Sequence, residues 1–181
     1  MTLSPAHEDR RDLNWIPPDI NSLKINCDGS FLDTNKTGGL GLIIRNFAGE
    51  HQGCKCIFLN RVENAEQAEC RSLWEAVQWA KEMKLERVEF ELDSKLVADA
   101  VNNESFSIDW RIHNMILDIK ILFKVFTLWS CSDVPKEKNK VVDILSKLAR
   151  VERLSSVWLT FPPSNIDAQL QEDTSFVNTH N

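Results

Sequence analysis

The sequence predicts an α/β fold built on one mixed sheet, and three observations lead to that prediction. Apolar and polar residues alternate over 23–59 with two turn-rich interruptions, which is the pattern of an antiparallel meander. At Asn64 the spacing of the apolar residues changes to that of a helix. From there to about residue 153 helix and strand patterns alternate. We therefore expect a five-stranded mixed sheet, three antiparallel strands and then two more, with helices on both faces.

Three strands come first. The first covers 23–32 and places Asp28 inside an alternating run that resumes with Phe31, so a simple hairpin turn at this aspartate fits poorly. Strands over 40–45 and 53–59 follow short connections that contain glycine. Because the connections are short, neighbouring strands are expected to be antiparallel.

The remaining elements alternate between the two periods. A helix is predicted over 64–84, where Asn64 and Gln67 resemble a capping box. The same criteria predict strands over 87–92 and 126–132 and helices over 95–101, 110–123 and 139–153.

Length and composition favour one domain with tails. The chain has 181 residues, of which 43% are hydrophobic and 27% charged, and this is enough to bury a core. We expect the domain over 15–160. The polar ends without periodicity predict a disordered leader over 1–14 and a disordered acidic tail over 161–181.

The net charge of the chain argues against binding of nucleic acid by overall positive charge. A net charge of −6 argues against a protein that holds nucleic acid by bulk charge alone, although a local basic patch is compatible with it. No run of residues approaches the roughly 18–20 apolar residues needed to span a bilayer. We expect no membrane partner, a monomer that is not secreted, and a location in the nucleus or cytoplasm.

The five cysteines do not predict disulfides. Their number is odd and their spacing irregular, and most lie in strand-like runs where thiols act as small apolar residues. Cys54-Lys55-Cys56 offers half of a metal site, but no second Cys/His pair stands at zinc-finger spacing. Reduced core thiols are the expectation.

Four acidic residues occupy positions that can converge. Asp28 lies on the first strand, Glu69 on the inward face of the first helix, Asp93 at the carboxyl end of the fourth strand, and Asp143 on the last helix. Like charges gathered together repel, so a fold gains little from them unless a cation lies between them. Oxygen ligands suit Mg²⁺ or Mn²⁺, and two such ions form the clamp used in phosphodiester cleavage.

Each acid also has a purely structural explanation. Asp28 could form a turn, and Glu69 could favour its helix end through the dipole. Asp93 could cap the helix it precedes. Asp143 could pair on the surface with Lys147, four residues later. Their joint occurrence in this order of elements favours the metal site.

Four motifs resemble those of the type 1 ribonuclease H family. They are Asp28-Gly29-Ser30, Ala68-Glu69, Glu91-Leu92-Asp93-Ser94, and the run from Val134 to Asp143. The chain is similar in particular to the plant ribonuclease H-like domains associated with reverse transcriptases of non-LTR retrotransposons. The likeness covers about residues 15–153.

The resemblance implies a ribonuclease H-like fold and hydrolysis of the RNA strand of an RNA–DNA hybrid. Asp28, Glu69, Asp93 and Asp143 would be the catalytic acids and would hold two Mg²⁺ ions, with Mn²⁺ as a substitute. Such a site reads the 2′-hydroxyls of an A-like duplex without base sequence. The expected nucleic-acid contacts are Gly29, Ser30, Asn35, Ser94, Lys95, Lys136, Lys138, Asn139 and Lys140.

A basic patch could meet phosphates or could be a solvated helix face. It comprises Lys136, Lys138, Lys140, Lys147, Arg150 and Arg153.

Two departures from the family favour a second function. Bacterial members often carry a histidine in the loop before the last helix, where this chain has Asp133, and some carry a basic handle that is absent here. The alternative to the nuclease is therefore a domesticated retroelement domain that binds nucleic acid or protein without cutting. A folded relic without activity is a third reading.

Overall fold

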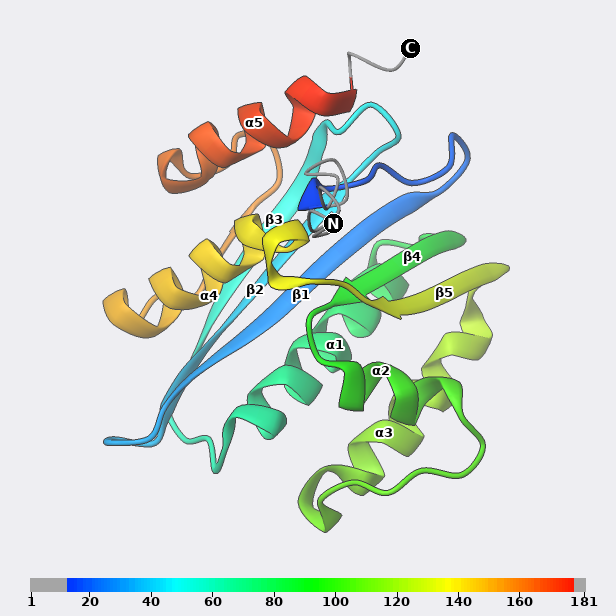
Figure 1. Cartoon of the computed structure of the whole chain (residues 1–181), viewed down its shortest axis with the longest axis vertical. Helices are drawn as coiled ribbons and strands as arrows, with labels where there is room; N and C mark the ends of the chain where they lie inside the picture. Colours follow the sequence, from blue (N-terminus) through cyan, green and yellow to red (C-terminus); the bar gives the residue numbers. More distant parts are fainter. Residues whose placement is uncertain (1–12, 178–181) are drawn as a thin grey trace, which may run out of the picture.

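The computed structural model describes residues 13–177 and contains, within them, a six-stranded sheet in the order β5-β4-β1-β2-β3-β6 (Figure 1). The strands are β1 Leu23–Leu32, β2 Thr37–Arg45, β3 His51–Leu59, β4 Arg87–Leu92, β5 Leu128–Asp133 and β6 Ser156–Trp158. The β1-β2-β3-β6 pairs are antiparallel, while β4 pairs in parallel with both β1 and β5. The predicted mixed sheet is confirmed, with β6 as an additional edge strand.

Helices cover both faces of the sheet, as predicted (Figure 1). They are α1 Ala65–Glu82, α2 Lys95–Asn102, α3 Trp110–Leu122, α4 Lys140–Glu152 and α5 Asp167–Val177, with short 3-10 turns η2 Phe123–Val125, η3 Lys136–Lys138 and η4 Ser164–Ile166. The first three α-helices lie on one face, and α4 and α5 lie on the other. The parallel strands β1 and β4 therefore lie between two helical layers, one of α1, α2 and α3 and the other of α4 and α5.

Helix α1 begins with a variant of the predicted capping box, in which the Gln67 side chain bonds to Glu63 and not to the cap residue Asn64. The backbone N–H of Gln67 donates to Asn64 Oδ1 at 2.7 Å, and the backbone N–H of Glu63 donates to Gln67 Oε1 at 2.8 Å. The first bond satisfies a backbone donor that a helix start leaves free, and the second ties the residue before the cap to the first turn. They also fix where α1 begins, and hence the position of Glu69 within its second turn.

The apolar core has a part on each face of the sheet. Ile25, Phe90 and Ile116 belong to the part beneath α1, α2 and α3, and Ile43 and Leu145 belong to the part beneath α4. All five cysteines are buried free thiols, as predicted. Burial raises the pKa of each of these thiols, which keeps them protonated and apolar.

The expectation of a disordered tail from residue 161 is wrong for the described part, 161–177. This segment forms η4 and α5, and α5 lies over the same face of the sheet as α4 (Figure 1). Two side chains dock it: Ile166 is fully buried, and Asp173 accepts a hydrogen bond from buried Arg45 at 2.7 Å. The polar composition of the segment hid the helix, because one of the contacts that dock it is an ion pair. Residues 178–181 of the predicted tail lie outside the described residues.

The entry segment packs against the domain through Trp15. Its indole is buried, its Nε1–H donates to Asn26 Oδ1 at 3.0 Å, and the guanidinium of Arg45 lies 3.9 Å from the ring centroid. Residues 1–12 of the predicted leader lie outside the described residues. Across residues 13–177, no helix is both long and apolar enough to cross a membrane.

Candidate metal centre

Asp28 lies in the middle of β1, directly opposite Gly41 of β2, and does not form a turn. Its side chain is nearly buried, with 4% of the residue exposed. Ser146 on α4 donates its hydroxyl to Asp28 Oδ2 at 2.9 Å. This contact fixes one carboxylate oxygen on the α4 side. The turn explanation for Asp28 is therefore wrong.

Gly29 allows α1 to approach β1 closely. A Cβ added at Gly29 would lie 2.4 Å from the backbone carbonyl carbon of Ala68 and 2.8 Å from the backbone nitrogen of Glu69. Such distances do not occur between real atoms, so any other residue would force the helix away from the strand. The glycine thereby brings Glu69 next to Asp28.

Gly41 has the same effect on the other face. A Cβ there would lie 2.4 Å from the carbonyl oxygen of Val142 in α4. The two glycines let helices from opposite layers come close to the strand pair that carries Asp28.

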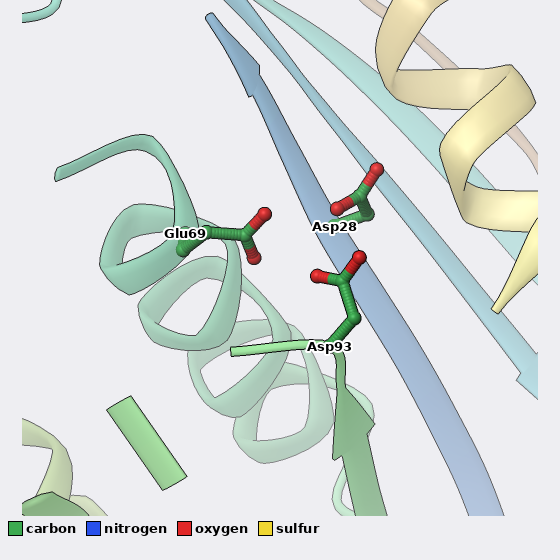
Figure 2. Close-up of side chains that lie close together, drawn as sticks. All are labelled: Asp28, Glu69 and Asp93. Carbon is green, nitrogen blue, oxygen red and sulfur yellow. The ribbon is translucent and has the colours of Figure 1, made fainter. Parts of the chain in front are cut away.

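Asp93 follows the end of β4. Its neighbour Ser94, and not Asp93 itself, is the N-cap of α2. The hydroxyl of Ser94 caps α2 by accepting from the backbone N–H of Val97 at 3.3 Å. The N-cap explanation for Asp93 is therefore wrong, and its carboxylate points instead toward Asp28 and Glu69 (Figure 2). Parallel pairing of β4 with β1 accounts for this meeting.

The three acids form one cluster. One carboxylate oxygen from each of Asp28, Glu69 and Asp93 lies within 4.8 Å of the others, although they come from β1, α1 and the end of β4 (Figure 2). Oxygen ligands lie about 2.0–2.1 Å from a Mg²⁺ ion, so two of them are at most roughly 4.2 Å apart. Small side-chain movements would therefore bring these three oxygens around one divalent cation. We call Asp28, Glu69 and Asp93 the acidic cluster.

Burial and mutual repulsion disfavour ionisation in the cluster. Burial raises the pKa of Asp28 from 3.8 to about 6, and the charges of Asp93 and Asp143 contribute to the rise. Burial also raises the pKa of Glu69 well above its usual range, with repulsion from Asp28 and Asp93 added. A cation between these groups would reverse both effects, since it favours the charged forms.

The residues present fit a hard divalent cation. The donors are all carboxylates, the ligand class preferred by Mg²⁺ and Mn²⁺. Glu69 Oε2 is buried and has no hydrogen-bond partner among the described residues. An unpaired buried carboxylate oxygen is costly in the protein alone, and a cation bound here would give this oxygen a partner.

Asp143 is not a member of the cluster. It lies in the first turn of α4, and its Oδ2 accepts from Lys147 Nζ at 2.9 Å, which is the surface pair that its spacing allowed. Its charge is nevertheless close enough to raise the pKa of Asp28. The fourth predicted acid thus stands beside the cluster with its carboxylate turned to Lys147.

The predicted nucleic-acid contacts differ in what their side chains do. Ser30 donates its hydroxyl to the carbonyl of Ser146 at 3.0 Å. Asn35 accepts from the backbone N–H of Thr37 at 3.1 Å and shapes the exposed hairpin turn. Lys95 is exposed and pairs with Asp99 at 3.1 Å. Lys136 and Lys140 are exposed, and Lys138 is half-buried.

Asn139 is a correction. It was expected to contact nucleic acid, but only 1% of it is exposed. Its Nδ2 donates to the backbone carbonyl of Cys27 at 3.0 Å, and its Oδ1 accepts from Asn26 Nδ2 at 3.0 Å. Both ends of its side-chain amide bond to β1, and so little of the residue is exposed that the side chain is not placed for contact with a ligand.

The basic patch follows η3 and α4, and its members have different neighbours. Lys147 pairs with Asp143, while the guanidinium of Arg153 lies 5.6 Å from the ring centroid of Phe58. Arg150 is half-buried, and its Nε has no hydrogen-bond partner among residues 13–177.

Sequence reasoning missed two residues near the cluster. Ser146 fixes a carboxylate oxygen of Asp28, and Asn26 joins β1 to the start of α4. The signal available for Asn26 was a polar residue on the same face of the strand as Asp28, two positions before it. A buried amide needs partners, so such a residue marks a buried polar contact.

Comparison with known proteins places this geometry in a family. A model of the family described as "Reverse transcriptase-like" matches residues 26–149. An Arabidopsis thaliana protein that carries a ribonuclease H name is 24% identical over 169 residues, which is 91% of this chain and 26% of that protein. The chain thus spans about a quarter of the length of this relative.

Solved ribonuclease H structures share the fold. RNase H1 from Halobacterium salinarum superposes with a TM-score of 0.67 at 20% identity, covering 74% of this chain and 99% of that chain. The N-terminal RNase H domain of Rv2228c from Mycobacterium tuberculosis gives 0.66 at 19% identity, covering 72% and 94%. LC11-RNase H1, in a complex with RNA/DNA hybrid, gives 0.66 at 20% identity, covering 74% and 99%. With a family match over more than half of its length, the chain belongs to the reverse transcriptase-like family and has the ribonuclease H fold.

Proposed function

We propose that the chain is a metal-dependent endonuclease that hydrolyses the RNA strand of RNA–DNA hybrids. The observation that carries this proposal is the meeting of Asp28, Glu69 and Asp93 from three separate elements, together with the unpartnered, buried Oε2 of Glu69. Membership of the reverse transcriptase-like family and a fold shared with ribonucleases H support it. One of the similar structures is a complex with RNA/DNA hybrid.

The finer part of the proposal concerns the cofactor. We infer that Asp28, Glu69, Asp93 and Asp143 hold two Mg²⁺ ions, which Mn²⁺ can replace. Bound ions of this kind activate a water for in-line attack and stabilise the leaving oxygen. The side chains must be ionised to bind them. Because burial raises the pKa of Glu69, its carboxyl releases a proton when the site fills.

The chain's own groups orient the acids. Ser146 holds Asp28 through Oδ2, which leaves Oδ1 for the cluster. For substrate contact we propose the groups predicted from the sequence, without Asn139: Gly29, Ser30, Asn35, Ser94, Lys95, Lys136, Lys138 and Lys140. These would read phosphates and 2′-hydroxyls of an A-like duplex. The monomeric state and the nuclear or cytoplasmic location stay predictions.

A specific observation favours a second candidate, a domain that binds nucleic acid or protein without cutting. The carboxylate of Asp143 is engaged by Lys147 and lies outside the acidic cluster. Asp133, in place of the loop histidine, is an exposed acid at the end of β5. Both features would slow turnover without abolishing metal binding.

Cleavage of a labelled RNA–DNA hybrid by the purified chain tests the proposal. We expect cutting in Mg²⁺ or Mn²⁺, no cutting of RNA–RNA duplex, and a loss of about 100-fold or more in Asp93→Asn, since a catalytic metal ion supplies several kcal/mol of charge stabilisation. The matched control is Asp118→Asn, which changes an exposed acid of α3 and should cut at the wild-type rate. No cutting in either metal by folded wild-type protein would refute the nuclease and favour the binding domain.

A further inference from the structure

Asn139 stands where α4 begins, but its side chain does not cap that helix. A side chain at this position usually accepts a backbone N–H of the first turn. Here the amide points the other way, into the sheet, and makes both of its bonds to β1. One of them reaches the carbonyl of Cys27, the residue immediately before Asp28. Asn139 therefore joins the start of α4 to the strand segment that carries a cluster acid.

The backbone of Asn139 extends this link to Asp143. The backbone N–H of Asp143 donates to the carbonyl of Asn139 at 3.2 Å, as the first helical bond of α4. The side chain of Asn139 fixes the helix start to β1, and its carbonyl fixes Asp143 one turn later. Asn139 thus links Cys27 to Asp143, because its side chain bonds to the first and its backbone carbonyl to the second.

The partner amide, Asn26, has little freedom to rearrange. Its Nδ2 donates to Asn139 Oδ1 and to Glu91 Oε2, both at 3.0 Å. Its Oδ1 accepts from Trp15 Nε1 at 3.0 Å and from Arg45 at 3.4 Å. Both amide protons and the carbonyl oxygen are in use. A fully bonded buried amide holds one orientation. The Nδ2 of Asn26 therefore stays in place as the donor to Asn139 at the start of α4.

From these contacts we propose that Asn139 is a positioning residue, which clamps α4 onto β1 so that Asp143 stands beside the acidic cluster and completes the divalent-metal site. The inference rests on the proposed function, because it concerns the same site. It differs from a plain packing role in one respect. A clamp of this kind controls where a ligand stands, so its loss weakens metal binding more than it weakens the fold.

Substitutions at Asn139 separate the clamp from packing. Asn139→Ala removes the amide and leaves a space, whereas Asn139→Leu removes the amide and keeps the number and branching of the side-chain heavy atoms. The control is Trp15→Phe, which deletes a different hydrogen bond to the same Asn26, the one made to its Oδ1 and not through its Nδ2. If packing at residue 139 sets the metal affinity, Asn139→Leu should bind Mn²⁺ as the wild type does. If the amide bonds matter, Ala and Leu should behave alike.

Calorimetric titration of each full-length variant with Mn²⁺ alone, without hybrid, measures metal binding directly, and urea unfolding in EDTA measures stability. We expect Asn139→Ala and Asn139→Leu to bind Mn²⁺ about 10- to 100-fold more weakly, the usual effect of removing a group that orients ligands. Trp15→Phe should retain wild-type Mn²⁺ affinity. Hydrogen exchange at the Asp143 amide should speed up in the two Asn139 variants only.

Three results would overturn the inference. They are wild-type affinity in Asn139→Leu, a matching loss of affinity in Trp15→Phe, and a wild-type chain that binds no Mn²⁺. The last of these would also refute the proposed metal-dependent function. By contrast, wild-type protein that binds Mn²⁺ but leaves hybrid uncut would refute only the nuclease, and the variants would still decide the role of Asn139.

Discussion

Replacing Asp28 by asparagine should stabilise the metal-free protein. Burial raises the pKa of the Asp28 carboxyl from 3.8 to about 6, so ionising it costs the folded state more than the unfolded state. At about 1.4 kcal/mol per pKa unit, the cost is about 3 kcal/mol above pH 6. Asparagine has a similar shape, keeps an oxygen for the Ser146 hydroxyl, and carries no charge to repel Glu69.

The size of this effect depends on pH. Below about pH 4 the Asp28 carboxyl is protonated in both states and costs nothing. As pH rises toward 6, the unfolded state ionises while the folded state retains the proton, so the free energy of unfolding of the wild type falls. Above about pH 6 the full penalty is present. The advantage of Asp28→Asn should therefore appear between pH 4 and 6 and persist at pH 8.

Urea unfolding in EDTA at pH 4, 6 and 8 measures the difference. We expect Asp28→Asn to gain about 2–3 kcal/mol at pH 8, or about 5–10 °C in Tm for a domain of this size. Adding Mg²⁺ should stabilise the wild type, by about 2.7 kcal/mol at 100 times the dissociation constant, and leave Asp28→Asn unchanged. Asp118→Asn, at an exposed site, should change stability by less than about 0.5 kcal/mol. Equal stability of wild type and Asp28→Asn at pH 8 would refute the reasoning, as would an equal response to Mg²⁺.

Two further predictions concern other parts of the domain. Asp173→Leu leaves Arg45 buried without its carboxylate, so it should lower the free energy of unfolding in urea by about 3–5 kcal/mol. Combining it with Arg45→Met should restore much of that loss. Additive losses in the double variant would contradict the buried pair. Ser94→Ala removes the cap of α2 and should cost about 1 kcal/mol in the same assay, while an unchanged midpoint would mean that the cap contributes nothing.

The regular elements of the fold could be predicted from local pattern. The meander, the helix capped by Asn64 and Gln67, and the strand that ends before Asp93 each appear at the expected place, because periodicity and caps are properties of neighbouring residues. The edge strand β6 is too short to show a period. Helix α5 depends on Asp173 meeting Arg45, 128 residues away, and no local pattern records such a contact.

The acids of the site could be named from the sequence, but their arrangement could not. Residue type and position singled out Asp28, Glu69 and Asp93, and the fold brings these three together. Asp143 was chosen on the same grounds, yet its carboxylate turns to Lys147. Which acids converge depends on how closely helices approach the sheet, and that is a matter of side-chain volume at the contact.

The sequence by itself determined the order of strands and helices from β1 to α4, the acidic character of the site and the reduced state of the thiols. These follow from periodicity, residue chemistry and spacing, which act over a few residues. Only the tertiary structure decided that Gly29 allows α1 to approach β1 and that Asn139 is buried with its amide bonded to β1. Each of these depends on contacts between segments distant in the chain, because close packing and the need to pair buried polar groups act across space.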